Sequence, residues 1–167
     1  MDRAREDRHG ARRPVRRRSR QESGPQGRPL TLRYLLDTTV FSEACKPRPS
    51  PRILQRLQDH GNESAVASVV WHEVRYGAAR LAPSKRRSAI EKYLEQAQER
   101  GVLILDYDGR AAEWHAVERA RLERIGKTPP FVDGQIAAIA AVNDLVVATV
   151  NTRDFSGFRG LKVERWG

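Results

Sequence analysis

Short apolar segments alternate with longer amphipathic segments from residue 31 to the end of the chain. The short segments have the length of buried strands, and they lie at 32–36, 64–69, 102–105 and 145–150, with a short edge strand at 161–164. The longer segments show helical spacing or helix caps, and they lie at 40–44, 51–59, 71–81, 84–100, 108–125 and 131–142. This alternation predicts a three-layer α/β/α sandwich with a central parallel sheet of four to five strands.

Four acidic residues lie at the boundaries of these predicted elements. Asp37 and Asp154 follow predicted strands, whereas Glu73 and Asp133 lie in the first turns of predicted helices. In a parallel sheet the carboxyl ends of the strands and the starts of the following helices share one edge, so these acids can converge. Carboxylates that converge repel each other, and a divalent cation is the usual reason for a fold to keep them together.

Each of these acids also has an explanation without function. Asp37 could cap the helix that follows it. Glu73 and Asp133 would be favoured near a helix N-terminus by the helix dipole. Asp154 could be a turn residue whose side chain bonds to its own backbone. No acid identifies a site by itself.

The net charge of +10 divides the 167 residues into two parts. Residues 1–30 contain ten Arg against four Asp or Glu, which leaves +4 for residues 31–167. Residues 1–30 lack apolar periodicity, so they are predicted to be a disordered basic arm, and 31–167 are predicted to form one folded domain. The arm could contact phosphates or could be a solvated tail.

Several classes of protein are excluded or disfavoured. The single Cys45 forms no internal disulfide, and no apolar run approaches the ~20 residues that cross a bilayer, so a cytoplasmic protein without membrane association is expected. The basic stretch is not followed by the apolar region of a signal peptide. His72-Glu73 would need a histidine at Tyr76 to form a zinc-protease motif, and His72 and His115 are expected at surface or boundary positions.

Four ordered segments together resemble the PIN-domain family, and more narrowly a VapC-type toxin of a type II toxin–antitoxin pair. They are residues 34–38, 68–77, 133–138 and 151–155. The resemblance implies a ribonuclease whose acidic cluster binds Mg²⁺ or Mn²⁺. Asp37, Glu73 and Asp133 match the three core acids of the family, and Asp154 matches its more variable fourth acid. Asn151 and Thr152 match polar positions that border the family's site, and Thr38 is a further candidate neighbour of the site. The family often has Asn where this chain has Thr39.

The chemistry of such a site can be stated by residue. We expect Asp37, Asp133 and Asp154 to bind the metal directly or through water, and Glu73 to bind it or to orient the attacking water. Arg153, Arg75 and Lys127 are candidates for the RNA backbone, although each could be an ordinary surface cation.

The resemblance also implies partners. They are a cognate antitoxin, operator DNA bound only through the antitoxin complex, an RNA substrate and a second copy of the chain in a homodimer. The alternative function is a catalytically weak regulatory module that binds nucleic acid through the basic arm.

Overall fold

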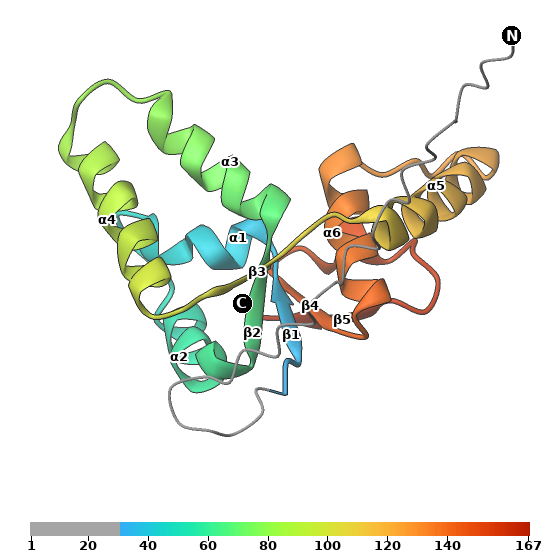
Figure 1. Ribbon diagram of the computed structural model, residues 1–167, viewed down its shortest axis with the longest axis horizontal. Helices are drawn as coiled ribbons and strands as arrows, with labels where there is room; N and C mark the ends of the chain where they lie inside the picture. The colour runs from blue at the N-terminus through green and yellow to red at the C-terminus, as the bar shows by residue number, and fades with distance from the viewer. Residues whose placement is uncertain (1–30) are drawn as a thin grey trace, which may run out of the picture.

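The computed structural model describes residues 31–167, and it contains one parallel five-stranded sheet (Figure 1). The strands are ordered β3-β2-β1-β4-β5, and their bounds are β1 Tyr34–Leu36, β2 Ser64–Ala67, β3 Leu103–Leu105, β4 Val146–Thr149 and β5 Lys162–Arg165. The predicted sheet and its edge strand are therefore confirmed. The predicted basic arm, residues 1–30, lies outside the described residues.

Helices cover both faces of the sheet and complete the predicted sandwich. They are α1 Thr38–Phe41, α2 Pro51–His60, α3 Ser68–Ala79, α4 Lys85–Glu99, α5 Gly109–Arg124 and α6 Phe131–Val142, with 3-10 turns η1 Ser42–Cys45, η2 Gly61–Glu63 and η3 Thr152–Phe155. The α3–α4 hairpin lies on one flank of the molecule, and α5 with α6 lies on the other (Figure 1). Among the described residues, no helix combines the length and the apolar character needed to span a membrane.

The start of α3 differs from the predicted boundary in a way that affects the site. The apolar run 64–70 was expected to remain a strand to residue 69, but β2 ends at Ala67 and α3 begins at Ser68. A short apolar run does not by its pattern distinguish a buried strand from a buried helix, and Val70, Val74 and Ala78 are in fact buried at helical spacing. Glu73 consequently lies in the second turn of α3, where the helix dipole stabilises a negative charge less than in the first turn.

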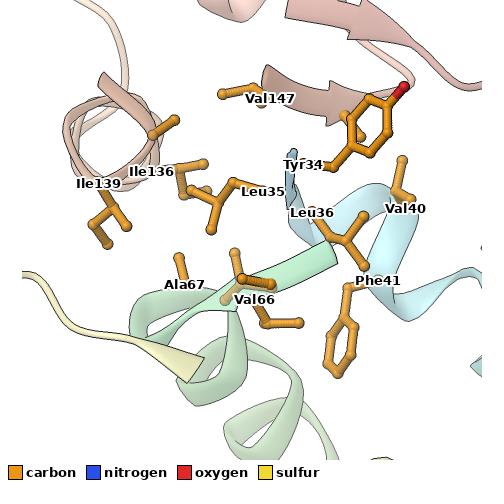
Figure 2. Close-up of a cluster of buried hydrophobic side chains, with 14 of the residues drawn as sticks. Tyr34, Leu35, Leu36, Val40, Phe41, Val66, Ala67, Ile136, Ile139 and Val147 are labelled. Carbon is orange, nitrogen blue, oxygen red and sulfur yellow. The ribbon is translucent and has the colours of Figure 1, made fainter. Parts of the chain in front are cut away.

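The core forms around β1 because alternate strand residues point to opposite faces. Figure 2 shows Leu35 facing Ile136 and Ile139 of α6, whereas Leu36 points toward Phe41. The α6 side chains from Ile136 to Ala140 are fully buried, as their nearly continuous apolar character predicts. The carboxyl end of β1 and the start of α6 are thus anchored in a packed core.

Candidate acidic active site

Asp37 lies where the strand order of the sheet reverses. The strands after β1 in the chain extend to one side through β2 and β3, whereas β4 and β5 lie on the other side. The Asp37 backbone amide donates to Ala148 O of β4 at 3.0 Å, which places the residue directly at the carboxyl ends of these two strands. Ligand sites of open parallel sheets occur at this kind of switch point.

Two threonine hydroxyl groups bind the Asp37 carboxylate. Oδ2 of Asp37 accepts from Thr39 Oγ1 at 2.7 Å and from Thr149 Oγ1 at 2.9 Å. The side chain is only 6 % exposed, and although the residue occupies the N-cap position of α1 it makes no side-chain capping bond. Helix capping therefore does not explain this acid. Thr39, the departure from the usual Asn, uses its hydroxyl to bond to the acid itself.

Glu73 reaches the same region from α3. Its carboxylate accepts a short hydrogen bond from Thr38 Oγ1, which joins the second turn of α3 to the first residue of α1. This bond crosses 35 positions of the sequence and uses a hydroxyl next to Asp37. Thr38 thus links two of the four acids.

Asp154 lies in η3, directly beyond β4. Its Oδ2 accepts from Asn151 Nδ2 at 2.6 Å, and the Asn151 backbone amide donates to Thr149 Oγ1 at 3.0 Å. The Asp154 side chain thus bonds to the side chain of Asn151 and not to the backbone of its turn. A continuous set of hydrogen bonds connects Asp154 to Asp37 through Asn151 and Thr149.

Asp133 completes the group from the first turn of α6. Its carboxyl group is half-buried, and burial together with the carboxylates of Asp37, Asp154 and Glu73 raises the pKa of Asp133 to about 6. Four acids from different elements therefore act on one another electrostatically. The structure brings together all four acids that the sequence singled out.

The donor set suits a hard divalent cation better than zinc. It consists of carboxylate and hydroxyl oxygens, and Mg²⁺ takes oxygen ligands and usually keeps several waters while binding one or two carboxylates. Within residues 31–167, no three acidic, histidine or cysteine side chains already form a ready-made ligand group. The site is thus an acidic cluster in which hydroxyl donors bond to the carboxylates of Asp37 and Glu73, and an amide donor bonds to that of Asp154.

The candidate RNA-binding cations separate into two places. Lys127 and Arg153 line a cavity of about 370 Å³ that also includes Asp154. Arg75 is exposed on α3 and does not line this cavity. Thr152, the remaining polar candidate, is half-buried in η3.

Two contributors to the site were missed by sequence reasoning. Thr149 is fully buried, and its only sequence signal is a polar residue at the end of an apolar strand. His115 was expected near the surface, which is wrong: it is 2 % exposed, on a face of α5 formed by Ala111, His115, Glu118 and Leu122.

His115 is buried because it fills a space beside Gly134. Its Nδ1 pairs with the Tyr107 hydroxyl at 2.9 Å, and a Cβ added to Gly134 would lie 2.1 Å from its Nε2. Burial and then Arg119 lower the pKa of His115, so the neutral ring is favoured. Gly134, the residue after Asp133 in α6, therefore packs directly against the imidazole ring of His115.

The chain is similar to known proteins over most of its length. Residues 34–161 match the PIN domain family. The chain is 31% identical over 136 residues to a tRNA(fMet)-specific endonuclease VapC of Salmonella typhimurium, covering 81% of this chain and 98% of that protein. It is 34% identical over 128 residues to toxin FitB of Neisseria gonorrhoeae, covering 72% of this chain and 89% of that protein.

Solved structures show the same fold. DNA-bound VapBC from Salmonella typhimurium aligns with a TM-score of 0.70 and 30% identity, over 81% of this chain and 99% of that one. FitAB bound to a DNA fragment also aligns with a TM-score of 0.70, at 29% identity over 80% of this chain and 96% of that one. The chain belongs to the PIN domain family. Within that family it is a VapC-type protein.

Proposed function

We propose that this protein is a metal-dependent endoribonuclease that acts as the toxin of a type II toxin–antitoxin pair. The observation that carries the proposal is the convergence of four acids at the switch point of the sheet. Burial, and then the carboxylates of Asp37, Asp154 and Glu73, raise the pKa of Asp133 to about 6. The names of similar proteins, which include an endonuclease and a toxin, support the same activity. The cation is Mg²⁺ or Mn²⁺, because the donors are oxygen atoms.

The proposed role of each acid follows from its burial and its hydrogen bonds. Asp37, which is buried, and Asp133, which is half-buried, would hold the cation together with the more exposed Asp154. A bound divalent cation supplies a Lewis acid for the scissile phosphate. Glu73, whose carboxylate accepts a hydrogen bond from Thr38, would bind the cation or orient the attacking water. The threonine hydroxyls keep the carboxylate of Asp37 in one orientation.

The partner is proposed to be a cognate antitoxin. The structures of similar proteins are VapBC and FitAB complexes, some of them bound to DNA, and operator DNA would accordingly be contacted through the antitoxin. An Arg from an antitoxin could pair with the acidic cluster, because a guanidinium forms two parallel hydrogen bonds to a carboxylate. The homodimer stays a prediction.

The test combines cleavage with metal-dependent stability. Asp37→Asn should abolish RNA cleavage while leaving the metal-free protein folded, because the amide keeps the shape of the carboxylate. Mn²⁺ at ~100-fold above its dissociation constant should stabilise the parent by about 2.7 kcal/mol, and this gain should shrink in the variant. Cleavage at the parental rate by Asp37→Asn would refute the assignment. RNA binding without any chelator-sensitive cleavage by the parent would favour the regulatory module instead.

A further inference from the structure

A cavity of about 370 Å³ opens beside the acidic cluster. Asp154, the fourth acid, forms part of its wall, so the cavity and the cluster share a residue. The remaining lining combines two cations with apolar groups, and it consists of Leu122, Lys127, Pro129, Pro130, Arg153, Ser156, Gly157 and Phe158. Nothing in the proposed hydrolysis itself requires such a cavity.

One wall of the cavity is held rigidly by α5. The buried Glu118 accepts from Arg121, whose Nη2 lies 2.6 Å from Oε2, and from the Arg159 backbone amide at 3.1 Å. Arg121 Nη2 also donates to Gly157 O at 2.7 Å. These bonds fasten the loop after η3, which contains part of the cavity lining, to a helix.

A second segment of the lining, residues 127–130, is also constrained. The Lys127 backbone amide donates to Leu122 O at 2.9 Å, which closes the end of α5. Pro129 and Pro130 then restrict the backbone before α6 begins at Phe131. The cavity is therefore preformed between two constrained loops.

The chemistry of the lining matches a nucleotide. Lys127 and Arg153 offer positive charge for a phosphate. The half-buried Pro129 and the exposed Pro130 offer apolar surface for the flat face of a base, whereas Leu122 and Phe158 are buried. A cavity of this volume lies at the small end of the ~300–1,000 Å³ range of ligand sites, so it suits one nucleotide and not a duplex. Proteins read RNA sequence mainly through unstacked bases of single strands.

We propose that this cavity binds one unstacked nucleotide of a single-stranded RNA next to the bond that is cleaved, with Lys127 and Arg153 on its flanking phosphate. This inference rests on the proposed ribonuclease activity and names the part of the substrate that selects the cleavage position. A base in the cavity and the scissile phosphate at the acids would be neighbours because Asp154 borders both.

The first test removes one base at a time from the substrate. A set of single-stranded oligoribonucleotides of one sequence, each with one abasic position, is cleaved by the parent and by Ser156→Trp, which fills the cavity. The parent should lose about tenfold in kcat/KM at one position beside the cleaved bond, because base stacking on protein contributes ~1–3 kcal/mol. Ser156→Trp should cleave the intact RNA more slowly and show no additional loss at that position.

The second test detects the phosphate contact by the salt dependence of cleavage. Lys127→Ala should reduce the slope of log(kcat/KM) against log salt by about 0.7, the value for one phosphate of a single strand. Lys92→Ala removes the same charge from an exposed position of α4 and should keep the parental slope. Equal slopes for Lys127→Ala and the parent would overturn the phosphate contact. This salt test remains decisive even when Ser156→Trp has no activity.

The outcomes separate this inference from the proposed function. A parent that cleaves no RNA fails the proposed function. A parent that cleaves all abasic substrates equally, or a Ser156→Trp variant with the parental loss at the same position, overturns only the nucleotide site. If both cavity variants cleave like the parent but are no longer inhibited by the antitoxin, the cavity binds a protein segment and the inference is wrong.

Discussion

Thr149 Oγ1 donates a 2.9 Å hydrogen bond to Oδ2 of Asp37, a residue 112 positions away in the sequence. A hydroxyl has one hydrogen to donate and lone pairs to accept, so the same oxygen accepts from the Asn151 amide at 3.0 Å. Thr149 therefore sets the orientation of Asp37 and of the segment that carries Asp154. Groups that orient ligands in this way affect the affinity of a metal site although they do not bind the metal.

Thr149→Val should lower cleavage and metal affinity by roughly 10–100-fold, because the variant keeps the volume of the side chain but removes the bond to Asp37. Cleavage kinetics and a Mn²⁺ titration of thermal stability measure the effect. Thr128→Val, on the exposed loop before α6, is the matched control and should behave like the parent. Parental metal affinity in Thr149→Val would show that the hydroxyl does not orient the site.

Gly134→Ala should destabilise the protein, against the usual preference of helices for Ala. The new Cβ would lie 2.1 Å from His115 Nε2, and such overpacking costs about 1–3 kcal/mol. Gly77→Ala in α3 is the control, because nothing lies within 4 Å of its added Cβ and a helical Gly to Ala change stabilises by about 0.5–1 kcal/mol. Urea unfolding of both variants gives the sign of the change in the free energy of unfolding. A Gly134→Ala variant more stable than the parent would contradict the packing of His115 against Gly134.

Glu118→Ala should lower the urea midpoint and also reduce cleavage. The change removes the acceptor of Arg121 and of the Arg159 amide, and thereby loosens the loop that follows Asp154. Glu123→Ala breaks the more exposed Arg119–Glu123 pair of the same helix, so its effect should stay within about 0.5 kcal/mol. Equal midpoints for the two variants would mean that the Glu118 bonds do not hold the loop.

The pH dependence of stability in EDTA should reveal the raised pKa of Asp133. Because the folded-state pKa of about 6 exceeds the ordinary aspartate pKa of 3.8, the contribution of this group to stability is present at low pH and is lost as the pH rises through about 6. Asp133→Asn cannot titrate, so the free energy of unfolding of the parent minus that of the variant should fall between pH 4 and pH 7.

This difference removes the contribution of acids outside the cluster. Arg121 is the main cause that lowers the pKa of Glu118, and Glu118 therefore contributes stability that is lost as the pH falls. The same contribution is present in both proteins and cancels. A difference that is flat or rises with pH would contradict the convergence of the carboxylates.

The sequence by itself determined the layers of this protein and the positions of its acids. Alternating apolar segments predict strands and helices because burial depends on local spacing, and the small apolar residues of α6 predict its central place. The positions of Asp37 and Asp133 follow from the same patterns. The start of α3 did not follow, because the run 64–70 fits a strand or a helix equally well by composition.

Only the tertiary structure decided what each side chain does within the cluster. The bond from Thr149 to Asp37 and the burial of His115 against Gly134 join residues far apart in the sequence, and no local pattern encodes such a distance. The cavity beside Asp154 likewise depends on the loop after η3, which is bonded to Arg121 and Glu118 of α5. Local propensity specifies elements, whereas the contacts that orient carboxylates form only when those elements are packed together.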